Sequence, residues 1–307
     1  PQRPPLGSSI ISCSRKGSKM DRLNLLKTLS EVNGIPGFEG EVRKLLASCV
    51  DGKCDLSTDN LGSLICRKVG TDGPKIMIPA HMDEIGFMVH VITEEGFIRF
   101  IPLGGWWDQV LLGKKVRIKT SRGLVTGVIG SKPPHILKED DRSKVTKKDA
   151  MFIDVGATSR AQALEEMGIR PGDPIFPVSE FEVLANGSVV AGKAWDDRAG
   201  CAALVELIDR LQGKSHPNTV YAVATVQEEV GLRGARTSTT MVAPDVGIAL
   251  DVGIAGDMPG VQPEESPLKL GAGPVLYVAD GDSIAHSGLR RFVIRTAEGM
   301  NIPLQFA

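Results

Sequence analysis

The sequence predicts an α/β protein whose α/β domain is interrupted by a small all-β domain. Three observations support this prediction: strands alternate with amphipathic helices towards both ends, short β-rich runs fill the middle, and metal-binding residue types follow several strands. Strand–helix alternation is typical of a sheet covered by helices, whereas short strands with turns about every ten residues are typical of a barrel or sandwich. Because the α/β pattern resumes after the β-rich block, we interpret that block as an insertion.

Composition excludes several classes of partner. The chain has 307 residues, of which 42% are hydrophobic and 24% charged, and its net charge is −1. Such a balanced charge does not attract nucleic acid or an anionic membrane, and no stretch approaches the ~18 continuous apolar residues of a membrane span. The five cysteines lack the paired spacing of a thiolate zinc site. We therefore predict a cytoplasmic protein with neither a nucleic-acid nor a membrane partner.

The first nineteen residues differ from the rest. Residues 1–19 are rich in proline, serine and basic side chains and contain no acidic residue. We predict a disordered leader, which is either an organelle transit segment or an upstream tail without a role. The fold prediction therefore begins at residue 20.

The first part of the predicted α/β domain comprises residues 20–84. An apolar stripe over residues 23–32 predicts a helix that ends at the glycine- and proline-containing segment 34–37. Residues 39–49 read as a second helix. Residues 63–68 and 75–79 read as strands because they are mainly apolar and follow turn signals.

The predicted all-β domain comprises residues 85–189. Its β-rich runs are separated by glycine, proline and aspartate turns, which predicts a small barrel or sandwich. The expected strands are 87–92, 97–101, 115–120, 124–129 and 151–154.

The α/β pattern resumes over residues 190–307. A helix is expected after Arg198, and residues 220–226 form a β-branched run typical of a strand buried on both faces. Further strands are expected at 245–250, 275–278 and 302–306.

Side chains that can bind metals follow several of these strands or precede the helix. Each position alone has an ordinary structural explanation: a helix cap, a turn-initiating aspartate, or an exposed turn with two solvated glutamates. Together they offer one imidazole and several carboxylates, a ligand set that suits Zn²⁺ or Co²⁺. The residues are His81, Asp83, Asp196, Asp197, Glu228, Glu229 and Asp251.

Two pairs in this set have separable roles. In extended chain, residues i and i+2 point to the same side, so Asp83 can accept a hydrogen bond from one ring nitrogen of His81 while the other nitrogen binds metal. Glu228 and Glu229 follow the 220–226 strand, at the edge where open α/β sheets bind ligands. Holding two repelling carboxylates there requires a cation, a shared proton or solvent. We interpret Glu228 as a general base and Glu229 as a metal ligand.

With these residues in place, the sequence resembles the tetrahedral (TET-type) dinuclear-metal aminopeptidases, a family of glutamyl and deblocking aminopeptidase-like metallopeptidases. The likeness runs from about residue 20 to residue 307. Each motif alone is weak, but the ordered set is specific. The matching segments are 34–37, 41–43, 59–62, 80–86, 196–200, 227–231 and 249–251.

The resemblance implies a mixed-sheet catalytic domain of the co-catalytic zinc exopeptidase type. It implies an aminopeptidase that releases amino-terminal residues from short peptides by means of a water activated by two divalent metal ions, Zn²⁺ or Co²⁺. The β domain would mediate dimerisation, and dimers would assemble into a homododecamer. The implied metal ligands are His81, Asp196 as the bridge, Glu229 and Asp251; the implied catalytic residues are Glu228, the base, and Asp83, the orienter of His81.

The resemblance also has a departure. The family pattern continues with a last histidine ligand for the second metal, which has no match at His90, His135, His216 or His286. The α/β domain is therefore expected to be incomplete at its C-terminal end. The alternative function that this leaves open is a catalytically impaired or non-catalytic assembly subunit of the family.

Other hydrolase classes also remain open at this stage. Related co-catalytic folds include carboxypeptidases and deacylases, and related sequences have been named glycan hydrolases. A glycosidase needs two opposed carboxylates without a metal, whereas a histidine among several carboxylates favours a metal site.

Overall fold

The computed structural model describes residues 21–281 and 283–307, so the predicted leader lies outside the described residues. The chain divides into two compact units, one ending at Asp251 and the other running from Val252 to Ala307. The predicted 190–307 segment is therefore split between two units. No helix among the described residues is long and apolar enough to cross a membrane.

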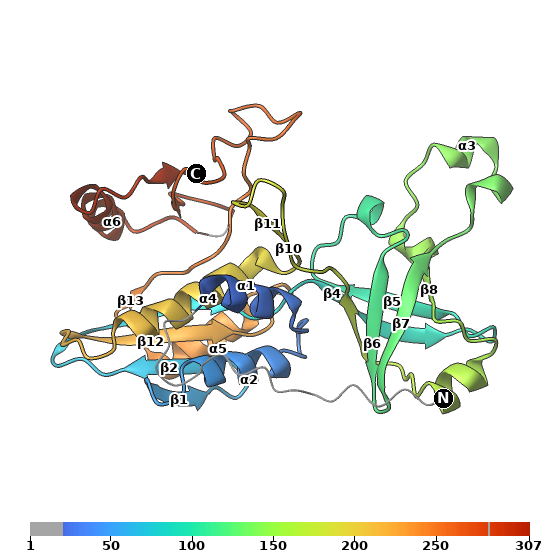
Figure 1. Ribbon diagram of the computed structural model, residues 1–307, viewed down its shortest axis with the longest axis horizontal. Helices are drawn as coiled ribbons and strands as arrows, with labels where there is room; N and C mark the ends of the chain where they lie inside the picture. Colours follow the sequence, from blue (N-terminus) through green and yellow to red (C-terminus); the bar gives the residue numbers. More distant parts are fainter. Residues whose placement is uncertain (1–20, 282) are drawn as a thin grey trace. The chain divides into compact units, whose positions relative to one another are not determined.

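A five-stranded sheet forms the centre of the first unit (Figure 1). β3, β12 and β13 run parallel to one another, whereas β2 is antiparallel to β12 and β1 to β2. The predicted mixed-sheet α/β class is thereby confirmed. The strands, in sheet order, are β1 (Asp55–Thr58), β2 (Leu64–Lys68), β12 (Asn218–Thr225), β3 (Gly73–His81) and β13 (Val246–Gly247).

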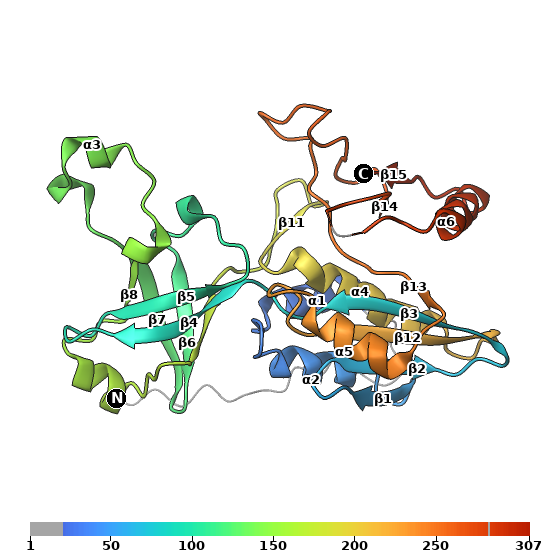
Figure 2. The same ribbon diagram turned by 180° about the vertical axis from the view of Figure 1, so that it is seen from behind.

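Helices cover both faces of this sheet, as the continuously apolar sequence of β12 predicts. Three of them, α1 (Arg22–Glu31), α2 (Gly40–Cys49) and α4 (Trp195–Arg210), contribute to one large core with β2, β3 and β12. α5 (Arg233–Val242) lies on the opposite face, where Val242 packs against Ile65, Met77 and Val223 (Figure 2).

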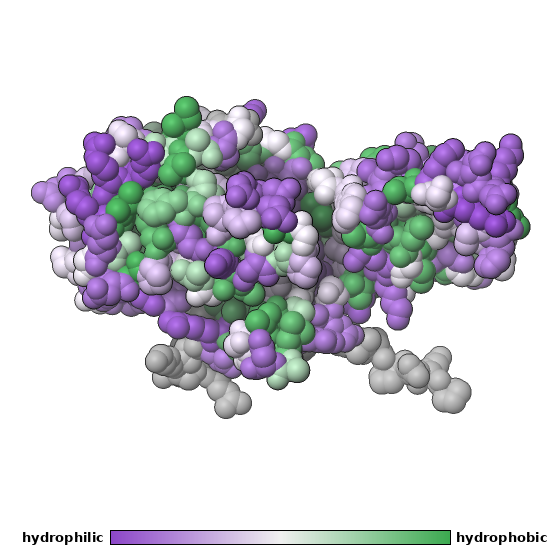
Figure 3. All heavy atoms as spheres, turned by 90° about the horizontal axis from the view of Figure 1, so that it is seen from above, coloured by the Kyte–Doolittle hydropathy of each residue, from purple (hydrophilic) through white to green (hydrophobic). Residues whose placement is uncertain are grey.

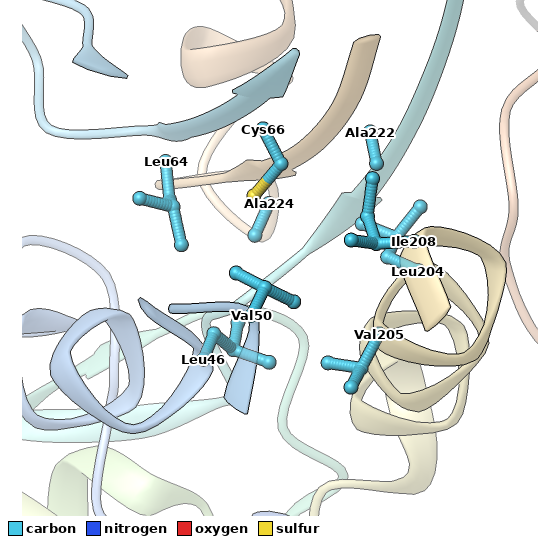
Figure 4. Close-up of a pocket in the computed structure, with 9 residues that line it drawn as sticks. All are labelled: Leu46, Val50, Leu64, Cys66, Leu204, Val205, Ile208, Ala222 and Ala224. Carbon is cyan, nitrogen blue, oxygen red and sulfur yellow. The ribbon is translucent and has the colours of Figure 1, made fainter. Parts of the chain in front are cut away.

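The large core contains one small cavity between α2, α4 and the sheet (Figure 4). Its volume is about 10 Å³ and its lining is apolar apart from the thiol of Cys66. A buried water needs two to four polar partners, which this lining does not provide. The cavity is therefore a packing gap and not a binding site. Its lining residues are Leu46, Val50, Leu64, Cys66, Leu204, Val205, Ile208, Ala222 and Ala224.

The middle of the chain forms a closed six-stranded barrel, as the β-rich texture predicts. One strand, β9, was not predicted; it pairs with both β4 and β6 and closes the barrel. The strands are β4 (Gly86–Ile92), β5 (Ile98–Leu103), β6 (Lys115–Thr120), β7 (Gly123–Gly130), β8 (Phe152–Asp154) and β9 (Pro174–Pro177). Short helical segments between them are η1 (Asp108–Val110), η2 (Pro134–Ile136), α3 (Glu139–Arg142), η3 (Lys148–Ala150) and η4 (Gln162–Glu166).

The barrel has its own apolar core. Phe87 is fully buried and stacks on Trp106, with ring centroids 4.6 Å apart, and the indole N–H of Trp106 donates to the carbonyl of Gly86. Trp107, in contrast, is 64% exposed. A two-stranded ribbon, β10 (Glu182–Val183) and β11 (Val190–Ala191), follows the barrel and precedes α4.

The second unit is small. β14 (Val275–Leu276) pairs in parallel with β15 (Gln305–Phe306), at the two places where strands were predicted. α6 (Ser287–Gly299) lies between them in sequence and was not predicted.

Candidate metal centre and active site

The carboxyl ends of β12, β3 and β13 lie side by side and supply most of the candidate site. His81 is the last residue of β3 and pairs in register with Thr225 at the end of β12. On the other side of β3, the amide of Leu250 donates to the carbonyl of Pro79, which brings Asp251 to the same edge. Such an edge is where open α/β sheets bind ligands.

The His81 side chain is 3% exposed and both ring nitrogens have partners. Nε2 lies 2.7 Å from Oδ1 of Asp196, and Nδ1 lies 2.9 Å from the backbone carbonyl of Asp83. The Asp83 carboxylate is 3.7 Å from Nδ1, so the ring is held by the carbonyl and not, as predicted, by a carboxylate hydrogen bond. Nε2 is thus the nitrogen that faces the site.

The two aspartates at the start of α4 differ in their surroundings. Asp196 has a side chain that is 57% exposed and points to His81 Nε2. Asp197 is fully buried, and its carboxylate accepts the amides of His81 and Gly200. A Cβ atom on Gly200 would lie 2.4 Å from Asp197 Oδ1, so only glycine admits this contact. Asp197 therefore supports the end of β3 and the first turn of the helix, while Asp196 is left for the site.

Among the described residues, one group of three potential metal ligands converges: His81, Asp196 and Asp251. One ligand atom from each lies within 4.8 Å of the others. An imidazole nitrogen with two carboxylate oxygens is a donor set that suits Zn²⁺ and related divalent ions. The residues present therefore fit a metal.

Glu228 and Glu229 lie on a turn directly after β12. Gln227 begins the turn with a φ of 54°, in the left-handed region that a residue with a side chain rarely adopts. Asp83 is fully buried, and its two carboxylate oxygens accept the amides of Glu228 (3.0 Å) and Glu229 (3.1 Å). Glu228 Oε2 lies 3.9 Å from His81 Nε2.

Crowding of these carboxylates shifts several pKa values. Burial alone would lower the pKa of His81, but Asp196, Asp83 and Asp197 outweigh it and raise that pKa to about 10. Burial, with repulsion from Asp196, raises the pKa of Glu229 to about 7. Burial likewise raises the pKa of Glu228. The concentrated negative charge indicates a place where a cation would be favourable.

Glu229 and Asp196 line one cleft of about 400 Å³. A Cβ atom on Gly104 would lie 3.1 Å from Glu229 Oε2 and 2.4 Å from the Ile85 side chain, so a glycine is required at this wall. Trp106 from the barrel and Trp195 from α4 also line the cleft. Residues from both parts of the first unit therefore surround the space beside the carboxylates.

Behind the site, Arg198 is fully buried and donates to four backbone carbonyls. Its Nε reaches Met82, between His81 and Asp83, at 2.6 Å. Its terminal nitrogens reach Leu29, Val32 and Gly34 at the C-terminal end of α1 and just beyond it. A buried ion pair between Lys193 and Glu84 lies beside it, with Glu84 3.8 Å from the guanidinium. These contacts fix the segment that carries His81.

Comparison with known families identifies the fold and the class of enzyme. The family model described as M42 glutamyl aminopeptidase matches residues 62–307, and a second, described as AMPT, matches residues 21–46. The chain belongs to the M42 glutamyl aminopeptidase family. It is accordingly a metallo-aminopeptidase, a hydrolase that acts on peptides, as the sequence resemblance implied.

Curated relatives support this assignment. The glutamyl aminopeptidase of Lactococcus lactis is 37% identical over 290 residues, covering 93% of this chain and 81% of its own length. The lysyl aminopeptidase of Pyrococcus furiosus is 38% identical over 287 residues, covering 92% and 79%.

Solved structures of M42-like peptidases match as well. A TET aminopeptidase from a marine sediment thaumarchaeon superimposes with a TM-score of 0.91 at 48% identity, covering 93% of this chain and 80% of the other. The TET1 peptidase of Pyrococcus horikoshii, described as able to assemble into a tetrahedron or a large octahedral shell, gives 0.82 at 34% identity, with 94% and 84% covered.

In this M42 chain, the structure brings all six predicted site residues to one edge of the sheet. His81, Asp196 and Asp251 converge directly, Glu228 approaches His81, and Glu229 shares the cleft with Asp196. His216 and His286 lie elsewhere: His216 contacts the carbonyl of Asn218, and His286 accepts the amide of Leu289 at the start of α6. The supporting roles of Asp197 and Arg198 were not predicted, although both belong to a motif that was recognised.

Proposed function

We propose that this chain is a two-metal aminopeptidase that removes amino-terminal residues from short peptides with Glu228 as general base. The observation that carries the proposal is the convergence of His81, Asp196 and Asp251 beside Glu228. Three strand ends and a helix start, far apart in sequence, contribute to this group.

The metal-binding roles follow from position and ligand type. His81 and Asp251 would hold one divalent ion, Glu229 would hold a second, and Asp196, which lies between His81 and the cleft of Glu229, would bridge them. Zn²⁺ and Co²⁺ both accept this mixture of nitrogen and oxygen ligands. When bound, such ions polarise a carbonyl and lower the pKa of water.

Glu228 is suited to move protons. Its side chain is 27% exposed, so the carboxylate is open to the site. Asp83 accepts the backbone amide of Glu228, which fixes the backbone from which this side chain projects. A Glu228 oxygen takes a proton from water as the water oxygen bonds to the scissile carbonyl carbon. When the C–N bond breaks, Glu228 returns that proton to the leaving amine nitrogen.

The substrate proposal is a short peptide with a free amino terminus. The cleft beside Asp196 and Glu229 is walled by Trp106 and Trp195 and carries acidic groups that attract an ammonium.

The test is Glu228→Gln, which keeps the size of the side chain and removes its basicity. We expect the variant to retain its bound metal, measured by atomic emission, and to lose about 10²–10⁴ in kcat on aminoacyl reporter substrates, because that is the usual contribution of a general base. Chelator-treated native protein, assayed before and after Zn²⁺ or Co²⁺ is restored, is the control. Undiminished peptide hydrolysis by metal-loaded Glu228→Gln rules out the mechanism.

We further propose self-association through the barrel, towards the homododecamer that the resemblance implies. Its support is a set of exposed apolar side chains on the barrel: Trp107, Val110, Leu112, Leu124 and Ile136. Apolar patches interrupt the polar surface in Figure 3, and it is contiguous exposed apolar patches that mark association surfaces. The alternative of a non-catalytic assembly subunit is favoured by no feature of the described residues, and the cytoplasmic location stays a prediction.

A further inference from the structure

The turn that carries Glu228 and Glu229 is held by carboxylates at three consecutive amides. Asp83 accepts those of Glu228 and Glu229, and Oε1 of Glu39 accepts that of Gln227 at 3.0 Å. Gln227 is also the residue with the left-handed φ of 54°. Such a conformation persists only when its surroundings hold it in place. The Glu39 contact is made at the strained residue itself.

The Glu39 side chain contacts the Gln227 turn and does not cap the helix that follows it. It immediately precedes α2, where a side chain ordinarily caps the first turn, yet it makes no capping bond to that helix. It is 5% exposed, and the same Oε1 accepts the amide of Gly37 at 2.9 Å. The carboxylate therefore joins the loop after α1 to a turn 188 residues away.

The position is electrostatically costly. Burial raises the pKa of Glu39, the amides of Gly37 and Gln227 lower it, and the charge of Asp83 raises it again. The contact with Gly37, within the Glu39 loop, does not by itself require a carboxylate that also reaches the amide of Gln227. Oε1 of Glu39 instead contacts the Gly37 amide and the Gln227 amide at the same time, which fixes its position relative to the Gln227 turn.

We propose that Glu39 is a positioning residue of the reaction: together with Asp83 it fixes the Gln227 turn and hence the directions in which Glu228 and Glu229 project. The inference rests on the proposed roles of Glu228 and Glu229. Because reacting groups must be placed to within a fraction of an ångström, a displacement of about 1 Å can cost up to 10²-fold in rate.

The experiment compares Glu39→Gln with Glu39→Asp. Gln leaves a carbonyl oxygen at the position of Oε1 and removes the charge, whereas Asp keeps the charge and withdraws the oxygen by about one carbon–carbon bond, ~1.5 Å. We expect kcat of Glu39→Gln within about threefold of native, and kcat of Glu39→Asp reduced about tenfold to a hundredfold with little change in KM. Zn²⁺ titration of the Asp variant should show weakened binding, because Glu229 is displaced with the turn.

Asp59 offers a matched control. It is also a buried carboxylate, 7% exposed, and its Oδ1 accepts the amides of Leu61, Gly62 and Ser63 at another turn. Asp59→Ala should lower Tm but leave kcat of the folded fraction and Zn²⁺ affinity unchanged. A loss in Glu39→Asp beyond that in Asp59→Ala, at equal folded fraction, supports positioning.

Three outcomes overturn the inference: native kcat in Glu39→Asp, a larger loss in Glu39→Gln than in Glu39→Asp, or losses that match Asp59→Ala at equal Tm. Failure of the proposed function is recognised separately. If Glu228→Gln is active, the assignment of the base is wrong whatever Glu39 does. If Glu228→Gln is inactive and Glu39→Asp is native, only the positioning role of Glu39 is wrong.

Discussion

Asp83 contacts both halves of the site at once. Its carbonyl meets His81 Nδ1, and its carboxylate meets the amides of Glu228 and Glu229. One buried residue thus orients the proposed metal-binding ring and the turn that carries the proposed base. The spacing in the sequence predicts that Asp83 lies beside His81. Which Asp83 oxygen contacts the ring cannot be read from that spacing, because the carboxylate is bound by the amide of Glu228, 145 residues away.

At this scale we expect Asp83→Asn to impair the protein in two ways. The amide side chain offers one acceptor where the carboxylate offers two, so one amide of the Glu228–Glu229 pair loses its partner and ~1–3 kcal/mol of unfolding free energy is lost. Residues behind a metal ligand typically contribute 10–100-fold to activity, which sets the expected loss in kcat. Denaturant titration and steady-state kinetics on one preparation measure both.

The control for this prediction is Asp55→Asn. Asp55 is an exposed carboxylate, 64% accessible, paired with Arg67 at the surface. Exposed pairs of this kind contribute ~0–1 kcal/mol, so neither stability nor kcat should change much. Equal effects of the two substitutions would remove the special role given to Asp83.

Arg198 joins the elements that frame the site. It belongs to α4, reaches the carbonyls at the end of α1, and holds Met82 between two site residues. Five donors in a planar fork allow one side chain to serve four carbonyls that lie in different directions. From the sequence, Arg198 was identified only as a member of the 196–200 motif. Its burial was not predicted, because the sequence pattern around a buried arginine does not differ from that around an exposed one.

We expect Arg198→Met to cost at least ~3 kcal/mol of unfolding free energy, because it leaves four buried backbone carbonyls without their donor and leaves Glu84 with Lys193 as its remaining cation. Arg198→Lys should recover only part of this loss, since an ammonium lacks the fork. Arg210→Met is the control: Arg210 pairs with Glu206 on the exposed side of the same helix. Urea unfolding that shows similar losses for Arg198→Met and Arg210→Met contradicts the bridging role.

Elements were predicted with unequal success, and the reasons are physical. Four of the five strands of the central sheet and five of the six barrel strands follow from apolar or alternating runs bounded by turns, whereas β1, which is exposed along its length, was not predicted. β9 was not predicted because its first and last residues are prolines, which are unfavourable in strands; its pairing with β4 and β6 stabilises it nevertheless. α5, which was not predicted, begins after a turn that is held by long-range contacts of Glu39 and Asp83 as well as by its own backbone hydrogen bonds.

At the scale of the whole molecule, the barrel and the α/β part divide the proposed tasks. The α/β part supplies the metal-binding edge, and the barrel contributes Trp106 and Gly105 to the cleft. The exposed apolar side chains of the barrel, among them Trp107, suggest that it also forms the interface between copies. This division was predictable from the change in sequence texture, whereas the cleft was not.

We expect Trp107→Glu to reduce the molar mass measured by size-exclusion chromatography with light scattering, because a buried charge disfavours an apolar interface. Val69→Glu is the control, since Val69 is similarly exposed, at 61%, but lies outside the barrel. Association through this barrel surface is contradicted if the molar mass of Trp107→Glu equals that of the native protein. It is also contradicted if Val69→Glu lowers the molar mass as much as Trp107→Glu does.

The most direct test of the central claim is calorimetric titration of chelator-treated protein with Zn²⁺. The account predicts that the native chain binds Zn²⁺ tightly and that Glu228→Gln binds it equally well. His81→Ala and Asp196→Ala should each lose more than about a hundredfold in Zn²⁺ affinity, since even residues behind a metal ligand contribute 10–100-fold. Native Zn²⁺ affinity in His81→Ala or Asp196→Ala would contradict the account, because the convergence at the sheet edge would then not be a metal site.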